Sequence, residues 1–426
     1  MGDSQEARRA RARFSVVFAV HGAVTGTFVT RIPWIQHHLG LNPGQLGIAL
    51  LAPAVGAFLA MPLAPRVVHR LGPHSALRTL MALWCLALAL PALAPNLPVL
   101  WLVLFLYGAV SGMASVQLNA QGVEVEQALG RSIMSGLHGL WSAGGLIASG
   151  FGVLAAGQHL DARIHLGVTA LVLTALALLT CRRLPDLRTD TDRSSARSAQ
   201  DTPSRFALPP RSALAIGLVG FCSVFAEGAS MDWAGVYLRD VTGASPAVAA
   251  GSFTAFAATM TAARLGGDLA VRRLGPVRTV RLGGGVATLG GLLVVCADAP
   301  RLAVPGFALI GIGVATVVPL AFAAAGRTTE PSRAIAGVAT ITYTAGLSAP
   351  ATIGLIAQAA SLRASFALVT ALTAGLIVTA GVLRPRPAPL RTGLPAPDGP
   401  TAPDGPSAPT GPTARRQDAR GSAERR

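Results

Sequence analysis

Long apolar runs recur along most of this chain, and each holds about 20 residues. A helix of that length crosses the roughly 30 Å hydrocarbon core of a bilayer. Only 13% of the 426 residues are charged, about half the share that solvates a soluble domain. We therefore predict an all-α integral membrane protein with twelve membrane-crossing helices, at 14–36, 45–65, 76–94, 99–123, 134–157, 164–181, 213–238, 246–267, 279–297, 302–325, 335–357 and 364–383.

The arginines predict how these helices are oriented. All 35 basic residues are arginine and the formal charge is +16, but no basic face with interleaved aromatic residues indicates nucleic-acid binding. Basic residues are retained on the cytoplasmic side, so the alternate loops that carry most of the arginines should lie there. Thirty arginines then fall on the cytoplasmic side, which predicts a multi-pass protein of the cytoplasmic membrane with both termini inside. Five lie elsewhere: Arg31, Arg163, Arg239, Arg301 and Arg363.

Two polar segments divide the chain. Residues 182–212, rich in Arg, Asp, Ser and Thr, separate six helices from six, and residues 384–426 repeat Ala-Pro-Asp-Gly-Pro. Neither composition can bury a core, so we expect a disordered cytoplasmic linker and a disordered cytoplasmic tail. The predicted domains are an amino-terminal bundle at 1–181 and a carboxy-terminal bundle at 213–383.

The two bundles carry an internal repeat. Arg70-Leu71-Gly72-Pro73 recurs as Arg273-Leu274-Gly275-Pro276, 203 positions later. Two further pairs of segments match in the same order at 202 and 206 positions, the second of them pairing His21-Gly22-Ala23 with Glu227-Gly228-Ala229. Such repeats predict two pseudo-symmetric six-helix halves. Many secondary transporters are built this way, with the substrate site between the halves near the middle of the membrane.

The repeated basic turns resemble the cytoplasmic signature of the major facilitator superfamily, in which Gly and Asp precede Arg-x-Gly and further basic residues. This chain departs from it, because His69 and Arg272 stand where the signature's Asp would precede Arg70 and Arg273. Pro73 and Pro276 also replace basic residues. The departure puts in doubt the charge relay that such turns provide, but not the fold.

A narrower resemblance, over roughly residues 14–383, is to the fucose-permease-like branch and its uncharacterised bacterial inner-membrane relatives. It is carried by residues 119–126, by His138-Gly139-Leu140-Trp141-Ser142 and by Glu227-Gly228-Ala229 with Asp232-Trp233. The resemblance implies solute transport, with acidic residues in the first and fourth helices for proton coupling in the branch's sugar symporters. Here the first helix offers His21 instead of an acid, so the carry-over of a sugar–proton mechanism is weak.

Glu227 is the leading candidate for chemistry, because it lies near the middle of the helix at 213–238. A carboxylate at that depth costs about 2.5–3.5 kcal/mol, so it is normally kept for a partner, a cavity or a proton. We expect it to couple protons or contact substrate, or else to make a structural bond between helices. Its repeat counterpart His21 titrates near neutral pH or is a satisfied buried histidine. Asp232, five positions after Glu227, faces elsewhere and could be an interfacial group.

Other polar residues of the predicted spans could contact a solute or simply pack. Arg31 either snorkels to the headgroups or binds an anion. Asn119 is on the fourth helix, whereas His138 and Trp141 share a face of the fifth. Thr340 and Tyr343 occupy the equivalent positions in the second half.

A cytoplasmic gate is expected from charged residues in and near the basic turns and in the charged turn that follows the fourth helix, the alternative being solvated loops. Its candidate members are Arg70, Arg273, Asp268, Glu124 and Arg131. Cys85, Cys181, Cys222 and Cys296 show no metal-binding or paired spacing, and we predict neither a metal nor a cofactor.

These patterns predict a secondary active transporter that moves a small solute by alternating access, coupled to protons, with no enzymatic activity. Uptake of a sugar-like solute follows the resemblance, whereas proton-driven efflux of a drug or metabolite fits an apolar cavity. A non-transporting membrane sensor on the same fold is the further alternative. The expected partners are a small-molecule substrate, the proton and the lipid bilayer, and a monomer is expected.

Overall fold

The computed structural model describes residues 2–129, 133–182 and 211–384, which are almost entirely helical, and no strand occurs among them. The described residues belong to one compact unit. Its first half runs through α1 (Gly2–Val29), α2 (Ile32–His38), α3 (Pro43–Ala60), η1 (Met61–Leu63), α4 (Ala64–Leu71), α5 (Pro73–Ala87), η2 (Leu90–Leu93), α6 (Leu97–Leu129), α7 (Met134–Gly157) and α8 (Ala162–Cys181). Its second half comprises α10 (Arg211–Thr242), α11 (Pro246–Val295), α12 (Pro300–Val314), α13 (Val317–Ala325), α14 (Pro331–Ala359), α15 (Leu362–Thr379) and η4 (Ala380–Leu383).

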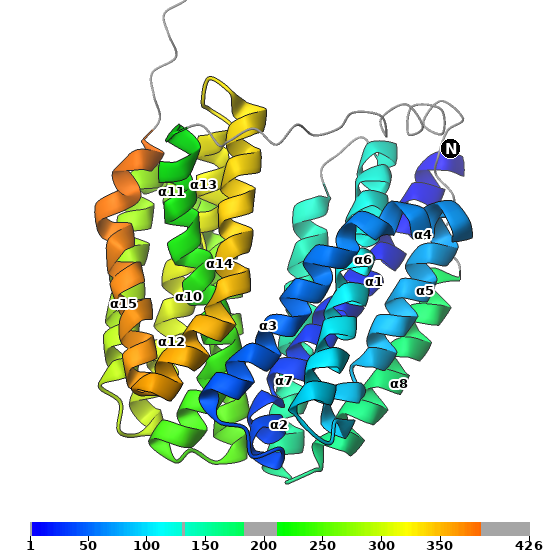
Figure 1. Cartoon of the computed structure of the whole chain (residues 1–426). Coiled ribbons are helices and arrows are strands. Elements are labelled where there is room, and N and C mark those ends of the chain that lie inside the picture. Colours follow the sequence, from blue (N-terminus) through cyan, green and yellow to red (C-terminus); the bar gives the residue numbers. More distant parts are fainter. Residues whose placement is uncertain (1, 130–132, 183–210, 385–426) are drawn as a thin grey trace, which may run out of the picture. The chain divides into compact units, whose positions relative to one another are not determined.

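The predicted all-α membrane fold is confirmed, with short pieces joining into longer spans such as α3 with α4 and α12 with α13 (Figure 1). Helix α7 has the predicted bounds, 134–157, whereas α10 extends past both ends of its predicted range. Nine helices of the described chain are long and apolar enough to cross a membrane. Helices α11 and α14 contribute no span to these nine. The basic residues of α11 and the many Thr and Ser residues of α14 lower their hydropathy.

The repeat predicted from the turns is visible in the backbone. Gly72 has φ 75° and ψ 158°, and Gly275 has φ 75° and ψ 164°. Glycine adopts this positive φ without the steric penalty that a Cβ would bring. Gly275 therefore divides α11 into two helices, as Gly72 divides α4 from α5, and a proline follows each glycine. The predicted linker at 182–212 and tail at 384–426 lie almost wholly outside the described residues.

Glycines bring helices into close contact within the first half. A Cβ built on Gly22 of α1 would lie 1.8 Å from the backbone oxygen of Trp141, and one on Gly144 of α7 would lie 2.0 Å from that of Ala19. Contacts this short exclude any larger side chain, as is common between membrane helices. The α1–α7 pair therefore holds Trp141 at a fixed place beside the first helix.

The two halves meet near the turns at 39–42, 158–161 and 243–245, which we call the short-loop end. There α3 contacts α14 and α7 contacts α11, and a Cβ on Gly354 would lie 2.6 Å from the backbone oxygen of Pro43. The halves are joined there by hydrogen bonds from Gln36 Nε2 to Asp240 Oδ2 at 3.0 Å and from Thr254 Oγ1 to Ser149 Oγ at 3.0 Å. The halves diverge toward the other end, which carries the turns at Gly72 and Gly275 and which we call the basic-turn end (Figure 1). The structure is therefore closed at the short-loop end.

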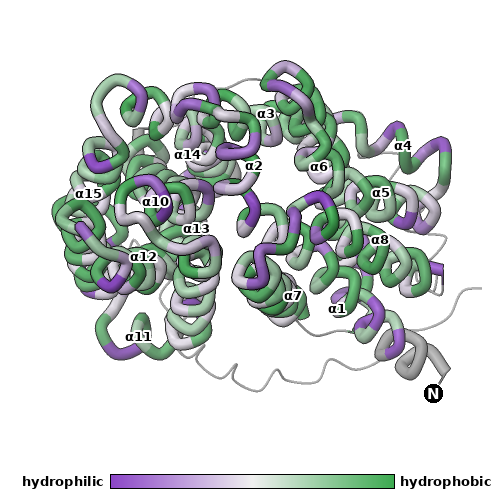
Figure 2. Tube along the Cα trace, turned by 90° about the horizontal axis from the view of Figure 1, so that it is seen from below, coloured by the Kyte–Doolittle hydropathy of each residue, from purple (hydrophilic) through white to green (hydrophobic). Residues whose placement is uncertain are grey.

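The outer surface is apolar. Large hydrophobic side chains such as Phe151, Leu171 and Val378 are 64%, 65% and 81% exposed. Viewed from the short-loop end, hydrophobic segments cover the outer helices, whereas hydrophilic ones gather at the turns (Figure 2). Lipid is the solvent that suits such a surface.

Candidate functional site

A small space lies between the halves and is lined by four helices, α1 and α7 from the first half and α10 and α11 from the second. It measures about 50 Å³ in this closed conformation. Most of its wall is apolar or glycine, with Phe253, Phe256, Met231 and Met260 on the second-half side. The polar lining residues are Thr25, Trp141, Ser142, Glu227, Thr261 and Arg264.

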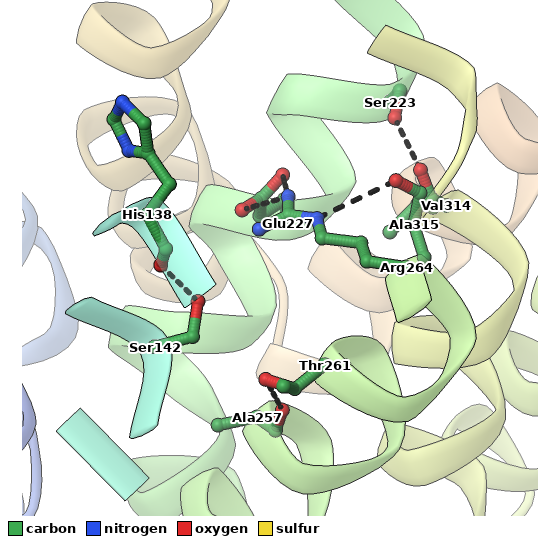
Figure 3. A network of polar contacts seen from close by, with 9 residues as sticks. All are labelled: His138, Ser142, Ser223, Glu227, Ala257, Thr261, Arg264, Val314 and Ala315. Carbon is green, nitrogen blue, oxygen red and sulfur yellow. Dashed lines mark hydrogen bonds and ion pairs between the residues drawn. The ribbon is translucent and has the colours of Figure 1, made fainter. Parts of the chain in front are cut away.

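Glu227 and Arg264 form an ion pair in this space (Figure 3). Arg264 Nη2 donates to Glu227 Oε1 at 3.1 Å and to Oε2 at 3.2 Å. The two side chains are 22% and 37% exposed, so the pair is only partly shielded. Glu227 therefore has a charged partner on α11, and its carboxylate is also open to the space between the halves.

The break between α12 and α13 provides a second hydrogen-bond acceptor for Arg264. Pro319 lies at the start of α13 and has no N–H, so it cannot donate to the carbonyl of Ala315 four residues earlier. Arg264 Nε donates to that carbonyl instead, at 3.4 Å. In the same region Ser223 Oγ donates to the carbonyl of Val314 at 3.2 Å (Figure 3). The break between α12 and α13 thus supplies an acceptor that aims the guanidinium at Glu227.

Arg264 is a site residue that was not among those predicted from the sequence. Counting arginines by loop assigned it to the basic turn that contains Arg272 and Arg273, whereas it lies inside α11, eleven residues before the bend at Gly275. A signal was present, because Arg264 falls within the predicted span 246–267 and so needs a partner at membrane depth. Among the predicted residues, Glu227 is the acid that meets this need.

His21 lies next to this space but does not line it. It is 8% exposed, and its Nδ1 accepts a 2.9 Å hydrogen bond from Trp141 Nε1. Its ring also lies 4.1 Å, centroid to centroid, from that of Trp84. Trp141 therefore links the buried histidine to the space that holds Glu227, with its indole ring at the wall.

His138 and Ser142 lie on α7 on the side of the space opposite Glu227 and Arg264 (Figure 3). The His138 side chain is exposed and packs edge-on against Phe18, with ring centroids 5.5 Å apart. Asn119 Nδ2 donates to the carbonyl of Ser115 in its own helix at 2.8 Å. In this conformation Trp141 lines the space, whereas His138 and Asn119 are not among its lining residues.

The predicted counterparts in the second half are also outside the space. Tyr343 is 67% exposed, and Thr340 is exposed with its Oγ1 bonded to the carbonyl of Ala336. Both lie toward the basic-turn end of α14, where the halves diverge. Asp232 is half-buried on α10 and does not line the space either.

Arg31 does not reach toward headgroups, so the snorkelling interpretation is wrong. Its side chain is 3% exposed, and its Nε donates to His165 Nδ1 at 3.0 Å. The cause is the turn between α1 and α2, which directs the arginine into the first half against α8. Arg31 and Glu227 belong to different cavities.

The predicted gate residues are placed only in part. Arg70 and Arg273 are exposed at the equivalent basic turns, and Glu124 is half-buried near the end of α6. Arg131 and the side chain of Asp268 lie outside the described residues. The neighbouring Glu126 caps α7, since its Oε2 accepts from the backbone N–H groups of Ile133 and Met134 at 2.7 and 2.9 Å. Within the described part of the chain, no three His, Cys, Asp or Glu side chains cluster as metal ligands would.

Comparison with known proteins decides the family, because the model of the Major Facilitator Superfamily matches residues 14–334. This chain belongs to the major facilitator superfamily. An uncharacterised transporter of Sinorhizobium fredii, y4wD, is 34% identical over 369 residues, which cover 86% of this chain and 96% of that protein.

Solved structures of two other transporters share the fold. The nucleoside transporter NupG superposes with a TM-score of 0.71 at 12% identity, over 88% of this chain and 98% of its own. FucP in its outward conformation gives a TM-score of 0.56 at 18% identity, over 88% of this chain and 98% of its own. The chain is thus a multi-pass membrane transporter of the major facilitator superfamily, and the predicted family resemblance is confirmed.

Proposed function

We propose that this transporter moves a small solute by alternating access, along a path between the halves that passes Glu227 and Arg264. The observation that carries the proposal is the ion pair itself. It lies near the middle of α10, on the wall of a space bounded by both halves. Charges are costly at that depth, and they recur where transporters bind solutes and ions.

The geometry supports coupling through competition for Glu227. While its carboxylate is ionised, it holds Arg264 Nη2 at 3.1 Å. A proton on Glu227 removes the negative charge and frees the guanidinium to bind a polar group of the solute. A solute that engages Arg264 likewise leaves Glu227 without its partner and favours its protonation. Solute and proton then assist one another's binding, as a symporter requires, whereas proton-driven efflux would require the solute and the proton to displace one another at Glu227.

The proposed orientation follows the arginine distribution. With the basic-turn end and both termini in the cytoplasm, closure at the short-loop end makes this an inward-facing conformation. The residues at 1–181 and 213–383 are the two proposed moving bundles, joined by the segment 182–212, and 384–426 is the proposed tail. Solute would be released toward the cytoplasm from the side where the halves diverge.

Two solute classes fit the lining of the space. Trp141 and Ser142 offer an aromatic face and a hydroxyl, which suit a sugar-like solute taken up with protons. Met231, Phe253, Phe256 and Met260 form an apolar wall, which suits proton-driven efflux of a hydrophobic drug or metabolite. The chain would work as a monomer in either case, because the proposed path lies within one copy.

Flux into proteoliposomes tests the proposal. The purified chain is reconstituted and given a panel of sugars, amino acids, organic anions and hydrophobic cations, with and without an imposed pH gradient. We expect at least one solute to accumulate or leave only when the gradient is present. Transport of a solute that ignores the gradient would contradict proton coupling, and binding without flux would favour a sensor.

A further inference from the structure

A second, larger cavity of about 240 Å³ lies at the short-loop end between the halves. It is bounded by the α1–α2 turn and α2, by the end of α7, and by residues near the α10–α11 turn. Its polar and aromatic lining residues are Thr30, Arg31, Trp34, His37, His38, His159 and Arg239.

The lining of this cavity is basic. The first half contributes the Arg31 guanidinium and the second half contributes that of Arg239, and three imidazoles complete the set. None of the eleven lining residues is Asp or Glu. Two carboxylates lie nearby: that of Asp161, which interacts electrostatically with Arg31 and accepts from the backbone N–H of Arg163 at 2.7 Å, and that of Asp240, which accepts from Gln36 Nε2 at 3.0 Å. Closure of this end therefore gathers positive charge from both halves around one cavity.

Arg31 is the decisive residue. It is 3% exposed, its Nε is bonded to the neutral acceptor His165 Nδ1, and its Nη2 is buried with no hydrogen-bond partner among the described residues. Asp161 offsets part of the charge of Arg31, but the buried Nη2 still lacks a hydrogen-bond acceptor, which an anion could supply. The adjoining cavity is large enough to hold one.

Part of the cavity wall is aromatic and comes from α2. The rings of Trp34 and His38 stack with centroids 4.5 Å apart and planes 10° from parallel. The guanidinium carbon of Arg163 lies 6.0 Å from the Trp34 ring centroid, and its Nη2 is 2.7 Å from His38 Nε2. These contacts fix both rings in place and leave Arg31 and Arg239 as the donors that can turn to a ligand.

We propose that this cavity is an anion-binding vestibule, which receives the carboxylate or phosphate group of a small solute between Arg31 and Arg239. The inference deepens the proposed function and rests on it, because it makes the transported solute an oxyanion. An anion held between guanidiniums of opposite halves stabilises the closed short-loop end. When that end opens, the two arginines separate and the anion is exchanged with the outer solution.

Direct binding tests the vestibule without requiring flux. Isothermal titration of the purified full chain in detergent, in a buffer free of other oxyanions, uses benzoate, its neutral counterpart benzamide, and inorganic phosphate, each up to about 10 mM. We expect benzoate or phosphate to bind, with benzamide at least tenfold weaker. Each charge-assisted hydrogen bond is worth roughly tenfold or more in affinity, so Arg31→Gln and Arg239→Gln should each weaken the Kd by about that factor.

Arg301→Gln is the matched control, because Arg301 is exposed at the same end but does not line the cavity. It should leave the Kd within about twofold of wild type. Arg239→Gln carries the test if the buried Arg31 proves essential for folding, which thermal melts will reveal. The inference is overturned by an absence of benzoate and phosphate binding, by equal affinity for benzamide, or by an unchanged Kd in Arg239→Gln. Flux failure with intact anion binding would instead count against the proposed function alone.

Discussion

Arg264 Nη2 lies between the two carboxylate oxygens of Glu227, 3.1 Å from Oε1 and 3.2 Å from Oε2. The pair joins α10 to α11 within the second half, while the first half faces it across the space through Trp141 and Ser142. Because this charged pair belongs to one half and faces the other, its surroundings depend on how the two halves pack together. The pair therefore ties α10 to α11, and in the proposed mechanism it is also the switch.

The structural contribution of the pair can be measured by a double-mutant cycle of Glu227→Gln and Arg264→Gln. Because both side chains are partly exposed, we expect a coupling energy of about 1 kcal/mol, favourable to the native state. Denaturant unfolding in detergent measures the three variants and the wild type. Additivity within about 0.3 kcal/mol would show that the two groups do not interact energetically.

Helix packing beside the site depends on Gly22. A Cβ at this position would lie 1.8 Å from the backbone oxygen of Trp141, so Gly22→Ala must push α1 and α7 apart. We expect a loss of about 1–3 kcal/mol in the free energy of unfolding, seen as a lower melting temperature. Gly150→Ala is the control on α7, because its Cβ would meet nothing within 4 Å. It should be neutral or slightly stabilising, and an equal loss in both variants would refute the packing argument.

The proposed orientation can be read from native cysteines. Cys296 is exposed at the short-loop end, whereas Cys85, Cys181 and Cys222 are buried. With that end outside the cytoplasm, a membrane-impermeant maleimide should label intact cells, and Cys296→Ser should abolish the labelling. Labelling of Cys296 that appears only after the cells are permeabilised would reverse the orientation.

Much of the fold could be predicted from the sequence, because the thickness of the membrane sets the length of the apolar helices. Apolar runs and breakers located the spans, and the bounds of α7 agree to the residue. The paired motifs at Gly72 and Gly275 predicted a repeat that the backbone angles reproduce. These features are local, so the sequence carries them directly.

The site could be predicted only in part, because it depends on tertiary contacts. Glu227 was correctly placed near the middle of its helix. Its partner Arg264 was counted with the loops, because the Gly- and Arg-rich sequence that follows it makes the end of the span at 246–267 hard to locate. Repeat symmetry paired His21 with Glu227, yet His21 is bonded to Trp141 inside the first half. Symmetry of sequence does not fix which side chains face the space, because the halves diverge at one end and meet at the other.

In the proposed mechanism, Glu227 exchanges the proton that drives transport. The most direct test follows proton movement with a pH-sensitive dye in proteoliposomes, once flux has identified a solute, and compares wild type with Glu227→Gln. Glu330→Gln serves as the control, because that carboxylate is exposed in a turn. We predict solute-dependent proton movement in wild type and Glu330→Gln, and its loss in Glu227→Gln while the variant still binds the solute. Undiminished solute-dependent proton movement in Glu227→Gln would contradict the account.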